Sequence, residues 1–252
     1  MQLPEEELPL DEAALVLAAQ ANPDLNVAAQ LQRLDDIAAR SERADTAAVS
    51  RVLFQTLGLR GDGQSYDEPV NSYIDRVLDR RRGIPISLSV LLIEVGRRCG
   101  LQLEGVGMPG HFLVRDPGAP ELLIDAFAGG QVLDRSGCQR LLRSVTGTDA
   151  ELTPAMLAAT GSRAILGRML ANLDRSFERR ADQRSLRWVS NLRLQIPDLP
   201  LGDRVQLAGR LGGLGQFEAA AALLEQLAEL PAAAEVAPRL RQEAASLRAR
   251  LN

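Results

Sequence analysis

Residues 71–130, NSYIDRVLDRRRGIPISLSVLLIEVGRRCGLQLEGVGMPGHFLVRDPGAPELLIDAFAGG, decide the fold of this chain. Residues 86–98 are apolar on nearly every side, a pattern typical of a helix buried at the centre of a domain. Three short strand-like runs follow at 101–106, 111–115 and 121–125, with glycine and proline turns between them. A central helix packed on a small antiparallel sheet is an α+β arrangement, which is the fold class we predict.

Three side chains of this stretch stand in the chain order of a nucleophile, a base and an orienting acid. Ser87 lies in the first turn of the predicted helix, His111 is the only histidine, and Asp125 ends the third strand-like run. Antiparallel pairing about a turn at 116–118 can place His111 and Asp125 on neighbouring strands, so we predict a buried His111 that contacts Asp125 through a ring nitrogen. Each residue also has a structural interpretation: Ser87 as a helix cap, and the pair as a packed, hydrogen-bonded unit.

Composition argues against several classes of protein. The chain has 252 residues, enough for one large or two modest domains, and its formal net charge of −4 argues against nucleic acid as a partner. Two cysteines, Cys99 and Cys138, and one histidine predict neither a disulfide framework nor a metal site, and we expect no cofactor. The N-terminus lacks the pattern of a signal peptide, and no apolar run is long enough to span a membrane. We therefore expect a cytoplasmic protein without a membrane partner.

The last third of the chain reads as helices only. Beyond residue 162 apolar residues recur at helical spacing, and the segment 181–200 resembles the segment 214–233. Their offset of 33 residues is close to the ~34-residue period of tetratricopeptide helical hairpins. Threonine, glycine and proline interrupt the helical pattern before this part of the chain. We therefore predict two domains: residues 1–150, with N-terminal helices and the α+β core, and residues 160–252, an all-α tetratricopeptide-like helical repeat.

Five segments of the chain resemble the SirB-type transglutaminase-like/tetratricopeptide-repeat proteins of bacteria. They are VLFQTLGLRGD (52–62), NSY (71–73), RVLDRRRGIPISLSVLLIEVGRR (76–98), EGVGMPGHFLVR (104–115) and LLIDAFAGGQVL (122–133). The resemblance covers about residues 45–252 and is strongest in the middle of the chain. It implies a transglutaminase-like core, related in fold to papain-type cysteine proteases, followed by tetratricopeptide-like helical repeats.

The same resemblance raises the question of catalysis. In the wider transglutaminase-like group the catalytic set is a cysteine, a histidine and an aspartate, with the cysteine at the N-terminus of the central helix. The resemblance implies that His111 and Asp125 hold the second and third positions of this set. The cysteine position falls within residues 85–87, which read PIS. Cys99 lies at the opposite end of the helix, about 18–20 Å away at ~1.5 Å per residue. The chain therefore lacks the thiolate nucleophile of that group.

These observations favour a protein that is not an enzyme and that binds a protein or peptide partner. The candidate ligand groove surrounds Ser87, His111 and Asp125, and the concave side of the helical hairpins is a second candidate surface. The alternative is a hydrolase or acyltransferase in which Ser87 is the nucleophile, His111 the base and Asp125 the residue that orients it. A purely structural role in a complex fits the same residues. The consecutive arginines 80–82 allow an anionic partner, although such a run at a helix end is usually only solvated.

Overall fold

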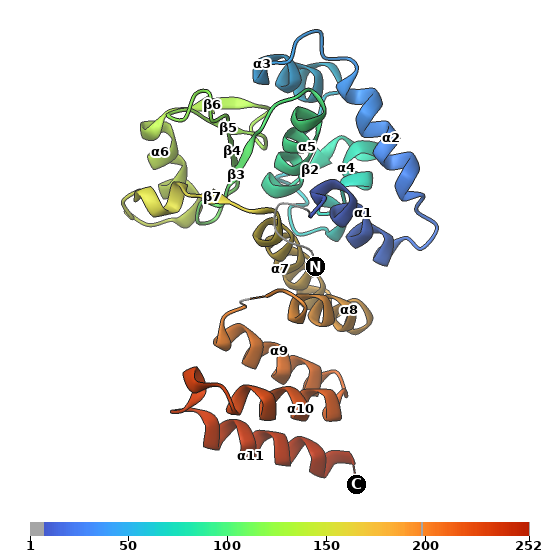
Figure 1. Cartoon of the computed structure of the whole chain (residues 1–252), viewed down its shortest axis with the longest axis vertical. Helices are drawn as coiled ribbons and strands as arrows, with labels where there is room; N and C mark the ends of the chain where they lie inside the picture. The colour runs from blue at the N-terminus through green and yellow to red at the C-terminus, as the bar shows by residue number, and fades with distance from the viewer. Residues whose placement is uncertain (1–7, 198, 252) are drawn as a thin grey trace. The chain divides into compact units, whose positions relative to one another are not determined.

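The computed structural model describes residues 8–197 and 199–251 of the chain (Figure 1). The chain divides into two compact units, Met1–Leu173 and Asp174–Asn252. The division falls inside helix α7 (Ser162–Arg179), and the domain boundary that the sequence suggests ahead of this helix stays a prediction. None of the helices formed by the described residues is both long and apolar enough to cross a membrane.

The first unit contains a five-stranded antiparallel sheet with the strand order β6-β5-β4-β3-β7. The strands are β3 (Glu104–Val106), β4 (Leu113–Arg115), β5 (Leu123–Asp125), β6 (Gln131–Leu133) and β7 (Ala159–Thr160). The first three fall within the predicted strand-like runs, whereas β6 and β7 are short additions at the two edges of the sheet. Val114 of β4 lies opposite Ile124 of β5, and this register brings the start of β4 beside the end of β5.

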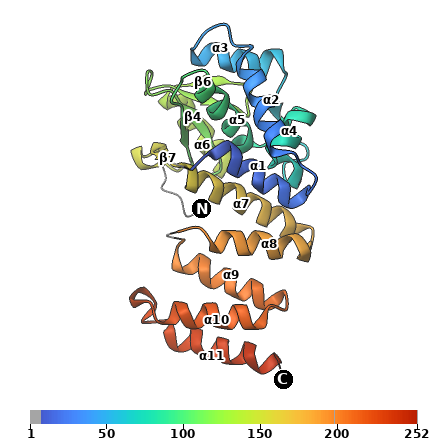
Figure 2. The same ribbon diagram turned by 45° about the vertical axis from the view of Figure 1, so that its right-hand side comes forward.

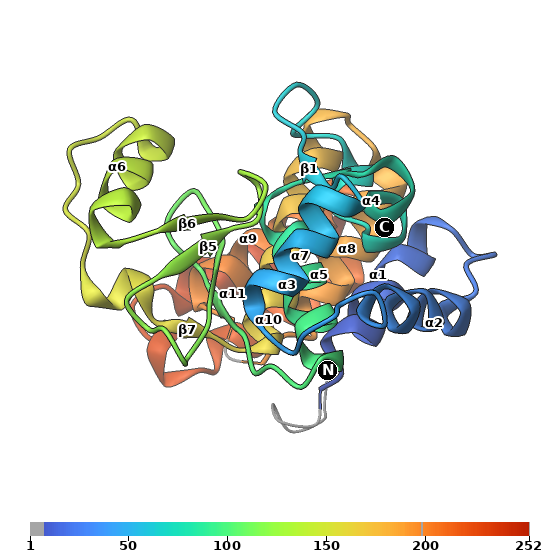
Figure 3. The same ribbon diagram turned by 90° about the horizontal axis from the view of Figure 1, so that it is seen from above.

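Helix α5 (Pro85–Arg98) is the central helix that the sequence predicts. Every residue from Pro85 to Gly96 is buried, as its continuous apolar pattern requires. A proline stands in its first turn, and two arginines stand in its last turn, where positive charge suits the helix dipole. Helix α5 contacts β3 and β4, while α6 (Arg135–Thr146) packs on the opposite side of the sheet (Figure 3). The predicted α+β class is therefore confirmed.

Further helices surround α5 on the side away from the sheet. They are α1 (Leu10–Ala21), α2 (Val27–Ala38) and α4 (Ile74–Arg80), and each contacts α5. Another helix, α3 (Thr46–Ser50), continues directly into a π-helical segment, Arg51–Thr56. Short π-helical segments are rare in proteins and occur frequently at functional sites. This segment is therefore a candidate wall of a binding site.

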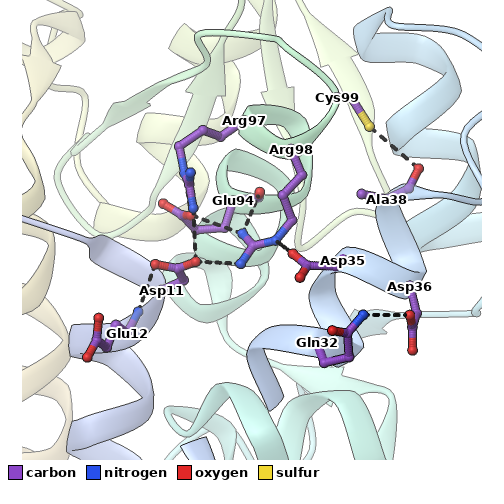
Figure 4. Close-up of polar contacts among 10 residues, drawn as sticks. All are labelled: Asp11, Glu12, Gln32, Asp35, Asp36, Ala38, Glu94, Arg97, Arg98 and Cys99. Atoms are coloured by element: carbon purple, nitrogen blue, oxygen red, sulfur yellow. Dashed lines mark hydrogen bonds and ion pairs between the residues drawn. The ribbon is translucent and has the colours of Figure 1, made fainter. Parts of the chain in front are cut away.

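An ionic cluster joins α1 and α2 to the C-terminal end of α5 (Figure 4). Arg98 donates to Asp11 (Nη2 to Oδ2, 2.6 Å) and to Asp35 (Nε to Oδ1, 2.6 Å). Arg97 donates to Glu94 (Nε to Oε2, 2.9 Å). Burial and the nearby Asp11 charge raise the pKa of the Glu94 carboxyl. Burial also acts to raise the pKa of Asp11, but the hydrogen bond from Arg98 and the two arginine charges outweigh it and lower that pKa.

The described residues of the second unit form helices joined by short connections and contain no strand, as the sequence predicts. After the end of α7 come α8 (Gln183–Leu194), α9 (Leu201–Gly213), α10 (Phe217–Ala228) and α11 (Ala237–Arg248), each packed against the next (Figure 2). Buried leucine and alanine side chains of α9, α10 and α11 form a common core. Helices α8 and α10 occupy the two segments whose sequences resemble each other.

Candidate functional site

His111 and Asp125 form a buried hydrogen-bonded pair, as the sequence predicts. His111 precedes β4 and Asp125 ends β5, and the antiparallel register of these strands brings the two side chains together. The Nε2 atom of His111 lies 2.9 Å from Oδ1 of Asp125, and the two residues are 6% and 4% exposed. A neutral ring that donates from Nε2 leaves Nδ1 as an acceptor. Within the described part of the chain, Nδ1 makes no hydrogen bond.

The Asp125 carboxylate also holds the turn that follows β5, residues 126–130. Its Oδ1 atom accepts hydrogen bonds from the backbone amides of Phe127 (3.0 Å) and Ala128 (3.1 Å). The His111 ring meets the Phe127 ring edge-on, with the ring centroids 6.0 Å apart. A single aspartate therefore positions both the histidine ring and the 126–130 turn.

Arg168 of α7 fixes the backbone that leads into β4. Its Nη2 atom donates to the carbonyl oxygens of His111 (3.0 Å) and Met108 (3.2 Å). Its guanidinium carbon lies 5.3 Å from the centre of the Phe112 ring, a cation–π distance. Our reading of the sequence missed this residue. It is 57 positions from His111 in the chain, and its own helix offers no local signal of the contact.

Ser87 is fully buried at the start of α5, and its hydroxyl group takes part in the helix cap. The Oγ atom accepts from the amide of Ile84 (3.1 Å) and donates to the carbonyl oxygen of Asn71 (2.6 Å). Among the described residues, no hydrogen bond joins Ser87 to His111. The structure therefore brings His111 and Asp125 together but leaves Ser87 in a separate set of contacts, so its catalytic role stays a prediction.

Neither cysteine lies at the start of α5. Cys99 is the residue after the last turn of this helix, and its Sγ atom lies 3.7 Å from the carbonyl oxygen of Ala38. Cys138 is buried in α6, where burial, and then the charges of Asp134 and Asp125, raise the pKa of its thiol. A thiol with a raised pKa is a poor nucleophile. Across the residues that the structure describes, no three histidine, cysteine, aspartate or glutamate side chains gather as possible metal ligands.

A polar network beside Ser87 was also missed by sequence reasoning. Asn71 is fully buried, donates to the carbonyl of Ser65 (Nδ2 to O, 2.6 Å) and accepts from Arg80 (Nη1 to Oδ1, 2.7 Å). Arg80 also approaches the buried Asp62 carboxylate at 3.4 Å. Burial acts to raise the pKa of Asp62, but hydrogen bonding, first from the Ser65 amide, and the neighbouring arginine charges lower it. The network explains the position of one of the three consecutive arginines, because the Arg80 side chain is hydrogen-bonded to Asn71.

A groove of about 370 Å³ opens between the sheet and the α3–π-helical segment. Leu122, Ile124 and Val132 form its apolar side, and Leu122 and Val132 are 43% and 57% exposed. Gly129 and Gly130 of the 126–130 turn also line it. Gly130 has a φ of +83°, and an added Cβ there would collide with Ser50 and Phe54 of the helical segment. The 126–130 turn, which Asp125 holds, is thus part of the groove wall.

Comparison with known proteins assigns the first unit to a family. Residues 17–171 match the sequence profile of a protein family that is described as the transglutaminase-like superfamily. A UPF0162 protein of Xylella fastidiosa (strain Temecula1) is 38% identical over 235 residues, which cover 85% of this chain and 83% of the relative. A UPF0162 protein of Pseudomonas aeruginosa is 34% identical over 172 residues, covering 65% of this chain and 63% of the relative. Mouse F-box only protein 21 is 34% identical over 135 residues, covering 50% of this chain and 21% of that protein. No solved structure matches the chain.

Proposed function

This chain belongs to the transglutaminase-like superfamily and to the UPF0162 family, and we propose that it is a non-catalytic module that binds an extended segment of a partner protein. We also propose that it is one of the SirB-type proteins that carry tetratricopeptide-like hairpins, and the segments 104–115 and 122–133 and the helical second unit support this. The observation that carries the proposal is that the Ser87 hydroxyl group is already hydrogen-bonded to two backbone groups.

A serine nucleophile needs a base within hydrogen-bond reach of its proton. The proton of Ser87 is directed to the Asn71 carbonyl, and the oxygen accepts from the Ile84 amide. Turning this hydroxyl toward His111 would leave buried backbone groups without partners, at about 1–3 kcal/mol each. Catalysis by Ser87 would therefore require a rearrangement at the start of the most buried helix of the domain.

The groove beside β6 supports binding. Strand β6 is an edge of the sheet, and an extended peptide can add to such an edge through backbone hydrogen bonds. Alternate side chains of the added peptide would then enter the apolar groove over Leu122, Ile124 and Val132. In this proposal His111 and Asp125 hold the 126–130 turn in the shape that the groove needs, and perform no chemistry.

The alternative function is hydrolysis or acyl transfer by Ser87, His111 and Asp125. One observation favours it: the Nδ1 atom of His111 makes no hydrogen bond among the described residues, as a base that takes a proton from a nucleophile requires. The two functions differ in what Ser87→Ala does. Peptide binding should survive this variant, whereas ester or amide hydrolysis by the triad should fall to background.

The test is selection from a random 12-residue peptide display library with the full chain. Val132→Asp places a charge in the groove, and Val16→Asp, at a valine of α1 that is 46% exposed, is the matched control. We expect the parent and Val16→Asp to enrich common peptides that Val132→Asp does not retain. The absence of any enriched peptide, together with hydrolysis that Ser87→Ala abolishes in a folded protein, would overturn the proposal in favour of the enzyme.

A further inference from the structure

We propose that the bound segment is acidic and that Arg60 and Arg82 receive its carboxylates. This inference rests on the proposed peptide-binding function and adds the chemistry of the partner. Strands β1 (Arg60–Gly61) and β2 (Arg82–Gly83) form a two-stranded parallel sheet just before α5. The structure brings together two arginines that are 22 positions apart and places them side by side.

Arg60 and Arg82 are direct partners in the β1–β2 register, so their side chains leave the same face of the small sheet. Like charges directly opposite each other on paired strands destabilise the pairing. Neither side chain makes an ion pair or a hydrogen bond within residues 8–197 and 199–251. Two arginines on one face of paired strands, neither of them in an ion pair with a described residue, form an arrangement that an anionic ligand would stabilise.

The neighbouring arginines differ from this pair, because contacts or a helix end account for their positions. Arg80 is bound to Asn71 and lies by Asp62. Arg81 ends α4, where a positive charge suits the helix dipole. Arg60 and Arg82 lie on strands, so the C-terminal end of a helix does not stabilise their charges. The Arg82 charge helps to lower the pKa of Asp62, but that carboxylate is buried and already accepts from the Ser65 amide.

The arginine pair adjoins the groove through the 126–130 turn. The Gly61 amide donates to the carbonyl oxygen of Phe127 (3.1 Å), and a Cβ added at Gly61 would lie 2.6 Å from the Phe127 ring. Gly129 and Gly130 of the same turn line the groove. A peptide that lies in the groove and continues past this turn would therefore bring its next residues toward Arg60 and Arg82.

Carboxylates suit this site because a guanidinium group forms paired hydrogen bonds with them in one plane. The chain as a whole carries a formal charge of −4, which favours a short acidic segment over a long polyanion as the ligand of the arginine pair. An acidic peptide is therefore favoured over a nucleic acid, which is bound through extended positive surfaces.

The experiment compares the full chain with Arg60→Gln/Arg82→Gln and with Arg40→Gln/Arg43→Gln. The control pair removes the same charge from two exposed arginines of the segment before α3 whose side chains make no ion pair among the described residues. Peptides are selected from the same display library. The most enriched one is then synthesised with a fluorescent label in its native form and with every Asp and Glu replaced by Asn and Gln. Binding is measured by fluorescence anisotropy, and folding of each variant by circular dichroism.

We expect enrichment of acidic peptides, and about tenfold tighter binding of the acidic form than of its amide form by the parent and by the control pair. The Arg60→Gln/Arg82→Gln protein should bind the two forms within about twofold. If that protein does not fold, Arg60→Gln alone, at an exposed position, should lower the preference to about threefold.

Four results would overturn the inference. Enriched peptides without acidic residues, or an unchanged preference in Arg60→Gln/Arg82→Gln, would leave peptide binding in place and remove its acidic character. Tighter binding of a 12-nucleotide single-stranded RNA than of the acidic peptide would make nucleic acid the ligand of the arginine pair. No enriched peptide at all would overturn this inference, and hydrolysis that Ser87→Ala abolishes would then overturn the proposed function as well.

Discussion

The Nε2 atom of His111 lies 2.9 Å from Oδ1 of Asp125, and that oxygen also accepts from two backbone amides of the turn that lines the groove. One carboxylate oxygen thus connects a buried histidine to the shape of a candidate binding surface. A hydrogen bond between a histidine and an aspartate is one part of a catalytic triad, but here the same carboxylate oxygen also supports the turn. Substitutions at the pair and around it separate these roles.

Asp125→Ala should destabilise the protein more than His111→Ala. Loss of the carboxylate leaves the His111 ring nitrogen and two turn amides without an acceptor, at about 3 kcal/mol in total, whereas loss of the ring should cost about 2 kcal/mol. Urea unfolding of the two variants measures the difference. Equal losses would show that the turn does not depend on Asp125. If both variants fold and bind every peptide as tightly as the parent, the binding surface lies in the helical second unit.

Ser87→Ala should cost about 2 kcal/mol of unfolding free energy, because Ile84 and Asn71 each lose a buried hydrogen-bond partner. Ser89 is the matched control: it is equally buried in α5, and its hydroxyl has no hydrogen-bond partner among the residues that the structure describes. Ser89→Ala should be neutral within about 0.5 kcal/mol. Similar losses of unfolding free energy in the two variants would show that the hydrogen bonds of Ser87 do not explain the destabilisation by Ser87→Ala.

Gly130→Ala should destabilise the protein and weaken peptide capture more than Gly129→Ala. Both glycines have positive φ, so alanine costs about 1 kcal/mol of backbone strain at either position. At Gly130 the new methyl group also collides with Ser50 and Phe54, which should add about 2 kcal/mol. Thermal unfolding and the peptide anisotropy assay measure the two effects. Equal behaviour of the variants would contradict the close approach of the helical segment to this turn.

Asp11→Asn should lose about 3 kcal/mol of stability at pH 7, because it breaks a buried ion pair with Arg98. The pKa of Asp11 is lowered in the folded protein, so its contribution is fully present above the unfolded value of 3.8 and is lost as the pH falls through the folded value. The difference between parent and variant should therefore shrink in acid. Asp35→Asn, at a side chain that is 54% exposed, should cost only about 0.5 kcal/mol. A difference that does not change below pH 4 would count against the assigned ion pair.

Replacing Cys99 and Cys138 together by alanine should leave binding, and any hydrolysis, intact apart from a loss of stability. The buried Cys138 should account for about 1–2 kcal/mol of that loss through the space it leaves. Peptide anisotropy and urea unfolding of the double variant provide the measurements. A double variant that folds but has lost peptide binding or hydrolysis would show that one of the two thiols belongs to the functional site.

The sequence by itself was sufficient for the features that depend on local patterns. Helix α5 follows from an apolar run closed by arginines, and β4 and β5 follow from two short apolar runs around a turn. His111 and Asp125 meet because a short antiparallel connection leaves few other arrangements. The helical second unit follows from periodicity, which needs no knowledge of distant contacts.

Only the tertiary structure decided the features that depend on residues far apart in the chain. Ser87 donates to a carbonyl 16 positions away, and Arg168 holds a turn 57 positions away. The alignment of Arg60 with Arg82 depends on a pairing of two-residue strands, too short to leave a periodic pattern. The groove exists because a π-helical segment packs against a glycine turn. Such contacts depend on the packing of the whole domain. Local sequence patterns therefore do not predict which distant group a side chain contacts.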